Sequence, residues 1–228
     1  MSDVDRELEE LFKIGAHLGH KKNRVHPKAK KYIYTIENGT SVVDLTKTVG
    51  LLQNALDFIT TLSKENKTLL VIVTKRISSQ FTKDLCQKTG IPYITVKWPA
   101  GLLTNFEMIM KNVKKLKAMS EAKEKGEWNK FVKHEQMKLT KDLNRLERFY
   151  GGLIKLEKHP DALFVIDIKK EKNAVEEAKT NKIPVVAVVD TNVNPDLVSY
   201  PIPANDDSLS SIEYFVAKVV DAYAKGKK

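Results

Sequence analysis

The sequence predicts an α/β fold: a doubly wound, mostly parallel sheet into which an antiparallel coiled-coil α-hairpin is inserted. Short runs of Val, Ile and Leu alternate with helical periodicities in both halves of the chain, as in parallel sheets with crossover helices. Between the halves, residues 106–150 contain no proline and no strand pattern. With 228 residues, 42% of them hydrophobic, the chain suits one globular domain with an appendage and is neither fibrous nor wholly disordered.

The first half of the sheet domain is predicted between residues 40 and 102. Apolar residues spaced by three and four from 45 to 62 predict a helix, and the branched run 69–73 predicts a buried strand. A second helix is predicted over 78–89, because Gly90 can take the left-handed conformation that ends a helix. Pro92 prevents its continuation and precedes a short strand over 93–96.

The same alternation returns after residue 160. Strands are predicted over 163–168 and 185–189, with a helix over 171–181 between them. Residues 198–202 are flanked by prolines and therefore predict a short edge strand. Residues 208–224 place their apolar side chains on one face and predict the closing helix.

The middle of the chain predicts two antiparallel helices separated around Gly126. Each has an apolar stripe at helical spacing: Phe106, Ile109, Met110, Val113 and Leu116 in the first, then Leu139, Leu143, Leu146 and Phe149 or Tyr150 in the second. Residues 111–148 carry twelve Lys or Arg against six Asp or Glu. This charge suits an arm that lies along a phosphate backbone, and a solvated coiled coil without a partner is the alternative.

The charge of the chain indicates a polyanionic partner. Lys and Arg number 39 against 29 Asp and Glu, and residues 11–36 hold seven cations and no acid. Residues 169–228 hold nine of each sign, so we expect two basic surfaces and a neutral half that faces protein. The longest apolar runs are far shorter than the ~18 residues of a membrane span, and the acidic N-terminus is unlike a signal peptide, so a soluble, cytoplasmic protein is expected.

Phosphate-binding loops of nucleotide enzymes are absent from the sequence. Neither GxGxxG nor GxxxxGK[ST] occurs. The turn after the strand at 69–73 contains Lys75 and Arg76 where such a loop needs glycines for close approach of its backbone amides. Dinucleotide or triphosphate binding of the usual kind is therefore not expected.

Aspartates stand where predicted strands end. Asp167 and Asp190 follow two of the strands, and Asp206 and Asp207 lie in a later loop. Carboxylates at this edge could hold a divalent ion, with Asp190, Asp206 and Asp207 as candidates, in a magnesium-dependent enzyme that handles phosphate. The favoured interpretation is that they cap the following helix or turn. We therefore expect no metal, no cofactor and no catalytic residue.

Residues 12–34 carry the clearest functional signal. They combine cations and glycines with two tyrosines and contain no acidic residue. Such a mixture suits folded RNA, because Lys and Arg bind phosphates while Tyr and His bind bases or sugars. His17, His20 and His26 fit no zinc spacing, so RNA contact is their preferred role. A solvated charged loop is the alternative.

Several motifs continue in register from residue 12 to residue 224. In the first half they are Gly15-Ala-His17-Leu-Gly19-His20, Pro27-Lys28, Asn38-Gly39, Thr74-Lys75-Arg76 and Leu103-Thr104-Asn105-Phe106. In the second half they are Gly151-Gly152, Pro160 to Asp167, Lys182-Ile183-Pro184, Val185 to Asn192 and Asn205-Asp206-Asp207. On these motifs the chain resembles the bacterial-type small-subunit ribosomal protein two family.

The resemblance implies a flavodoxin-like or Rossmann-like sheet with an inserted coiled-coil hairpin, and a structural role without catalysis. It implies binding to small-subunit ribosomal RNA and to neighbouring ribosomal proteins, and late entry into subunit assembly. It also implies recruitment of the large messenger-binding small-subunit protein one during translation. The protein would be a monomer within cytoplasmic ribosomes without a membrane partner, and a plastid or other organelle ribosome is the alternative location.

Charge and resemblance together give the expected RNA-binding surface, to which the hairpin adds phosphate contacts. Its candidate residues are Lys13, His17, His20, Lys21, Lys22, Arg24, Lys28, Lys30, Lys31, Tyr32, Lys75, Arg76, Lys97, Trp98, Thr104, Asn105, Lys111, Lys114 and Lys115. The expected division of the chain is a basic RNA-contacting segment (1–36), the first half of the α/β domain (37–105), the hairpin (106–152) and the second half (153–228). A protein-docking scaffold, whose association would be insensitive to salt, is a further alternative.

Overall fold

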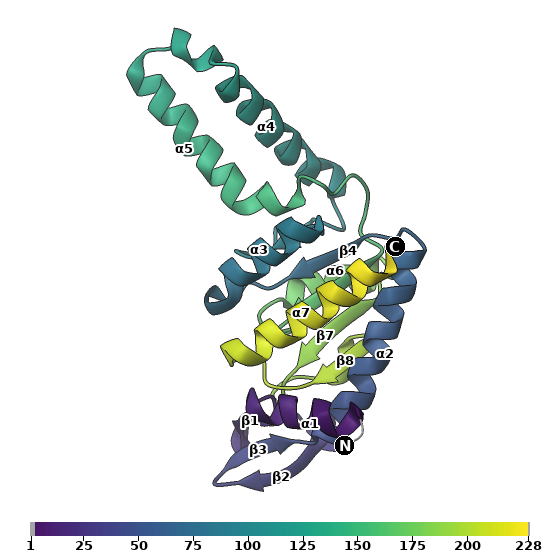
Figure 1. The fold of residues 1–228 in the computed structure, drawn as a ribbon. Helices are drawn as coiled ribbons and strands as arrows, with labels where there is room; N and C mark the ends of the chain where they lie inside the picture. The colour runs from purple at the N-terminus through teal and green to yellow at the C-terminus, as the bar shows by residue number, and fades with distance from the viewer. Residues whose placement is uncertain (1–2, 228) are drawn as a thin grey trace.

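A five-stranded parallel sheet forms the centre of the fold in the computed structural model, which describes residues 3–227 (Figure 1). Its strand order is β5-β4-β6-β7-β8, and the strands are β4 (Leu69–Ile72), β5 (Tyr93–Ile94), β6 (Ala162–Ile166), β7 (Val185–Val189) and β8 (Tyr200–Pro203). Every residue of β4, β6 and β7 is buried, as expected for a parallel sheet covered on both faces. The predicted α/β class with a parallel, Rossmann-like sheet is confirmed.

Helices cover both faces of this sheet. α2 (Leu45–Lys64), α3 (Ser79–Thr89) and α7 (Leu209–Gly226) contribute to one apolar cluster, which includes Val71 and Phe164. α6 (Lys172–Thr180) contributes to a second cluster, which includes Ile72 and Leu163. Successive strand residues point to opposite faces, so alternate residues of β4 and β6 belong to the two clusters. Within residues 3–227, no helix is both long and apolar enough to cross a membrane.

The boundaries of these elements lie close to the predicted ones. Gly90 ends α3 in the predicted left-handed conformation, with φ of 74°. β5 ends at Ile94, two residues before the predicted end, and β8 begins at Tyr200, two residues after the predicted start.

α4 (Phe106–Glu124) and α5 (Lys133–Tyr150) project from the sheet domain and lie side by side (Figure 1). Gly126, with φ of 70°, precedes the short 3-10 helix Glu127–Lys130 that joins them. Leu116, Trp128 and Leu143 form a small buried cluster between the two helices. Two helices with a break near Gly126 therefore occur where the sequence predicts them, although Trp128 lies outside the predicted stripes.

The N-terminal region contains a helix and a small antiparallel sheet that the sequence analysis did not predict. The helix is α1 (Asp3–Lys13), and the strands are β1 (Leu18–Lys21), β2 (Ile33–Glu37) and β3 (Thr40–Val43), in the order β1-β3-β2. Asn38 and Gly39 have φ of 48° and 76° and form the two-residue turn between β2 and β3. This sheet lies at the end of the molecule opposite α4 and α5 (Figure 1).

Candidate nucleic-acid interface

The basic N-terminal segment is held against the carboxyl ends of β7 and β8. The amide of His26 donates to the carbonyl of Thr191 at 2.8 Å, and the amide of Asn205 donates to the carbonyl of Ala16 at 2.9 Å. The amide of His20 also donates to the hydroxyl of Thr191, at 2.9 Å. The segment is therefore positioned by the sheet domain and is not a free loop.

Gly19 permits this close approach. A Cβ at Gly19 would lie 2.7 Å from Cγ2 of Thr191 and 3.1 Å from the carbonyl oxygen of Ser41. We expect Gly19→Ala to lower the free energy of unfolding by about 1–3 kcal/mol, because β1 must move away from β7. Urea unfolding of the variant measures this loss. The matched control is Gly50→Ala, where the added methyl meets no atom within 4 Å; a loss as large as in Gly19→Ala would contradict the packing argument.

The cations of the N-terminal segment divide into paired and unpaired groups. Lys28 and Lys31 form ion pairs with Asp196 at 3.0 and 2.9 Å, which hold the segment near the start of β8. Lys13 pairs with Glu9 at 3.7 Å. The remaining candidates are exposed and form no ion pair with any residue that the structure describes: Lys21, Lys22, Arg24 and Lys30. These four are available to an outside anion.

Aromatic groups accompany these cations. Tyr34 was absent from the candidate set, yet its side chain is 77% exposed on β2 and offers a flat face to a base. Tyr32 is half-buried, and the Lys31 ammonium lies 5.1 Å from the centre of its ring. The ring of His17 stacks on Phe12 at 4.4 Å, and burial lowers the pKa of His17, so its imidazole is neutral near pH 7.

Trp98, a candidate for RNA contact, lies in the interior of the protein. The side chain is only 4% exposed, and its indole N–H donates to Oε1 of Glu177 at 2.8 Å. The same carboxylate accepts the amides of Gly101 and Leu103 at 2.8 and 3.0 Å. Trp98 therefore fixes its loop on α6. Four other candidates outside the N-terminal segment are exposed, namely Arg76, Lys97, Thr104 and Asn105.

Lys75 is likewise an internal cation and not a free phosphate ligand. Its Nζ lies 2.9 Å from Asp206, 2.6 Å from Asp207 and 3.4 Å from Asp167. Burial by itself would lower the pKa of Lys75, but these carboxylates raise it above the ordinary value. Burial also raises the pKa of Asp206 to about 7, against the opposing effect of Lys75. Two of the three aspartates considered as metal ligands therefore have a cation from the chain itself.

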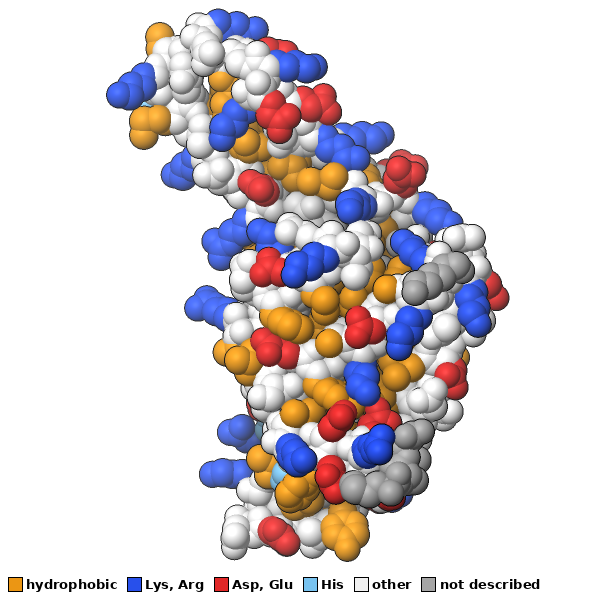
Figure 2. All heavy atoms as spheres, in the orientation of Figure 1, with side chains coloured by type: hydrophobic (Ala, Val, Ile, Leu, Met, Phe, Trp, Pro, Cys, Tyr) orange, Lys and Arg blue, Asp and Glu red, His pale blue; other side chains and the backbone are white. Residues whose placement is uncertain are grey.

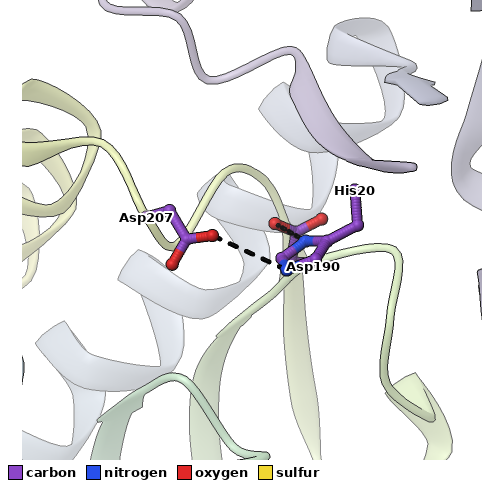
Figure 3. A group of neighbouring side chains, drawn as sticks. All are labelled: His20, Asp190 and Asp207. Atoms are coloured by element: carbon purple, nitrogen blue, oxygen red, sulfur yellow. Dashed lines mark hydrogen bonds and ion pairs between the residues drawn. The ribbon is translucent and has the colours of Figure 1, made fainter. Parts of the chain in front are cut away.

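His20, Asp190 and Asp207 converge beside this cluster (Figure 3). Nδ1 of His20 lies 2.8 Å from Oδ2 of Asp190, and its Nε2 lies 3.6 Å from Oδ2 of Asp207 and 2.9 Å from Nδ2 of Asn192. Their nitrogen and oxygen atoms are of the types that bind divalent metals. Both ring nitrogens of His20 thus have partners within the chain, and these contacts join β1 to the end of β7.

The cations of α4 and α5 form a second exposed basic surface. Figure 2 shows Lys and Arg side chains distributed over this helix pair, with acidic side chains among them. The three candidates on α4 are all exposed: Lys111, Lys114 and Lys115. The N-terminal segment and the pair α4 and α5, which carry these two basic regions, lie at opposite ends of the molecule (Figure 1).

Known proteins resemble this chain over nearly its whole length. The family described as ribosomal protein S2 matches residues 11–226. A protein of Coprothermobacter proteolyticus, named small ribosomal subunit protein uS2, is 40% identical over 221 residues, which cover 97% of this chain and 82% of the relative. A protein of Petrotoga mobilis with the same name is also 40% identical over 221 residues, covering 97% of this chain and 77% of the relative.

Proposed function

The chain belongs to the ribosomal protein S2 family, and on that premise we propose that it binds small-subunit ribosomal RNA through the exposed cations of its N-terminal segment. It is a small-subunit ribosomal protein, and its family is structural and not enzymatic. The strand-end aspartates therefore do not form the centre of a magnesium-dependent enzyme. The contacts of Asp206 and Asp207 with Lys75, and of Asp190 with His20, stabilise the fold instead.

One observation carries the RNA proposal: four cations of the N-terminal segment are each exposed and have no ion pair among the described residues, namely Lys21, Lys22, Arg24 and Lys30. Unpaired cations on a folded surface gain most from phosphates, because no internal partner must first be displaced. Tyr34, exposed on β2 of the same N-terminal region, offers stacking to a base or sugar. The hydrogen bonds to the residues that follow β7 and β8 hold this surface in a fixed position, which favours shape-based contact with folded RNA. We keep residues 1–36 as the RNA-contacting segment, 37–105 and 153–228 as the two halves of the α/β domain and 106–152 as the insertion.

A second surface extends the proposal to α4 and α5. We infer that these helices act as a coiled-coil arm, with Lys111, Lys114 and Lys115 placed along RNA phosphates. The buried cluster of Leu116, Trp128 and Leu143 supports the pairing of the helices, and exposure of the three lysines supports the contact. Arg76, Lys97, Thr104 and Asn105 would join this surface near the base of the arm.

The neutral C-terminal half is proposed to face protein. Residues 169–228 carry nine Lys or Arg and nine Asp or Glu, so this half has little net attraction for phosphate. We propose that the protein enters the subunit late, as a single copy, and that this half helps recruit the large messenger-binding small-subunit protein one. Small subunits that lack the chain should then lose that protein on sedimentation, and its full retention would contradict this part of the proposal.

Sucrose-gradient sedimentation of a cell extract tests the main proposal. The chain should co-migrate with the small subunit at moderate salt. At high salt a smaller fraction of it should do so, because salt competes with contacts to phosphate. If the chain remained at the top of the gradient at both salt concentrations, while the subunits were otherwise complete, RNA binding within the subunit would be contradicted.

A further inference from the structure

A cavity of about 650 Å³ opens at the carboxyl ends of β4, β5 and β6. The strand order reverses here, because β5 lies on one side of β4 while β6, β7 and β8 follow on the other. In open α/β sheets, ligands bind in the crevice at such a switch point. The walls come from Thr74 after β4, Lys97 after β5, Lys170 after β6 and Arg148 of α5. The position of this cavity therefore matches that of a ligand site.

The lining of this cavity is cationic. It contains one carboxylate, that of Glu171, and four cations: Arg76, Lys97, Arg148 and Lys170. All four cations are exposed, and none forms an ion pair with a described residue. Nζ of Lys170 donates to the carbonyl of Thr74 at 2.9 Å, which leaves two of its three N–H groups free. The cavity therefore offers several charged donors and has no internal anion that satisfies them.

Glu171 weakens this positive field only in part. Its side chain is buried, accepts the hydroxyl of Thr74, and lies near the ammonium of Lys170. Burial raises the pKa of Glu171 above that of an ordinary carboxyl, and Lys170 acts in the opposite direction. An anion in the cavity would face four cations and this one shielded carboxylate.

Two helices also begin at the cavity. α3 starts at Ser79 and α6 starts at Lys172, and neither N-cap residue, Ser78 or Glu171, makes a side-chain capping hydrogen bond. Ser79 and Asn173, in the first turns of these helices, line the cavity. The positive ends of both helix dipoles therefore add to the charge of the side chains.

A second cavity, of about 710 Å³, continues this surface toward the projecting helices. It shares Lys97, Trp98 and Asn173 with the first cavity and adds Lys115 and Arg145, with Asp142 as its one carboxylate. A ligand with several phosphates could thus extend from the switch point along the base of α4 and α5.

We propose that the switch-point cavity is a phosphate site, held by Arg76, Lys97, Arg148 and Lys170, for the phosphate group of RNA or of a free nucleotide. The sequence lacks a glycine-rich loop, so side-chain cations take the place of backbone amides, and binding should depend little on the base. If RNA supplies the phosphate, this inference deepens the proposed function.

Titration calorimetry of the full chain tests this site with two probes, pyrophosphate and a single-stranded RNA of ten uridines. We expect Arg148→Gln and Lys170→Gln each to weaken pyrophosphate binding about tenfold, through loss of a charge-assisted hydrogen bond. The matched control is Lys141→Gln, an exposed cation on α5 outside the linings of both cavities, which should bind like the unmodified chain. Lys170 also bonds the carbonyl of Thr74, whereas no hydrogen bond is seen for the Arg148 side chain among the described residues, so the Arg148 variant keeps the test valid if the Lys170 variant does not fold.

The two probes distinguish the source of the phosphate. Competition between the RNA and pyrophosphate supports a site for the RNA backbone, and pyrophosphate binding without competition supports a site for a free nucleotide. Absence of pyrophosphate binding, or equal losses in the cavity variants and the Lys141 control, would overturn the site. If the chain binds ribosomal RNA but the cavity variants bind pyrophosphate normally, only the phosphate site is contradicted. If the chain binds pyrophosphate in this cavity but does not bind ribosomal RNA, only the proposed function is contradicted.

Discussion

Replacement of Lys75 by methionine is expected to lower the free energy of unfolding by about 3 kcal/mol at pH 8, because it leaves a group of carboxylates without their cation. The Lys75 side chain is 13% exposed, and that of its partner Asp206 is 4% exposed, so water screens this pair weakly. Asp167 and Asp207 also contact the same ammonium, at 3.4 and 2.6 Å. Methionine keeps most of the side-chain volume, so the loss reports on charge more than on packing.

The loss in Lys75→Met should be smaller at pH 5.5 than at pH 8. The pKa of Asp206 is raised from an ordinary 3.8 to about 7 in the folded chain, chiefly by burial. A carboxyl whose folded-state pKa exceeds its unfolded value favours the folded state increasingly as the pH falls through that folded pKa. Removal of Lys75 raises this pKa further, so protonation of Asp206 offsets part of the missing cation at the lower pH.

Urea unfolding at both pH values measures these changes. Lys67→Met is the matched control, because its ion pair with Glu65 is about half exposed on both sides and its loss should change stability little. Equal losses in Lys75→Met at pH 5.5 and pH 8, or a loss no larger than that of the control, would show that Lys75 does not neutralise the strand-end carboxylates.

The triple variant Lys21→Ala, Lys22→Ala and Arg24→Ala is expected to bind small-subunit ribosomal RNA on the order of a hundredfold more weakly at low salt. Each lost phosphate contact also reduces the slope of log K against log salt concentration by about one. Filter binding at several salt concentrations therefore measures two quantities, and both should fall together. The three residues are exposed and unpaired, so the fold should be unchanged.

The matched control for this variant removes three exposed lysines elsewhere: Lys64, Lys179 and Lys225. Both variants reduce the net charge of +10 by the same amount, so a general effect of charge would weaken both equally. A surface located at the N-terminal segment predicts a large loss only in the first variant. Similar affinities and salt slopes in the two variants would remove that assignment.

The sheet domain could be predicted from sequence because its strands are apolar throughout. β6 and β7 are buried on both faces, so unbroken runs of branched residues mark them. β1 and β2 gave no such signal, since most of their residues are exposed or half-buried and the strands are stabilised by hydrogen bonds to distant parts of the chain. The Asn38-Gly39 turn is the one local feature that could have indicated this hairpin.

The exposure of the N-terminal cations could be predicted from the sequence. That three candidate RNA-binding residues instead bind carboxylates within the protein could not. His20, Lys75 and Trp98 each find a partner far along the chain: Asp190 is 170 residues from His20, Asp206 is 131 from Lys75, and Glu177 is 79 from Trp98. The type and spacing of residues along the chain do not show which of them will meet a distant carboxylate in the folded protein. Only the tertiary structure distinguishes a cation that neutralises a carboxylate within the protein from a cation that is free to bind RNA.

Lysine acetylation footprinting of the chain, free and bound to small-subunit ribosomal RNA, tests the central claim most directly. We predict that Lys21, Lys22 and Lys30 become strongly protected in the complex, while Lys64, Lys179 and Lys225 react as they do in the free chain. Unchanged reactivity of Lys21, Lys22 and Lys30 in the complex would contradict the claim that the N-terminal segment binds the RNA.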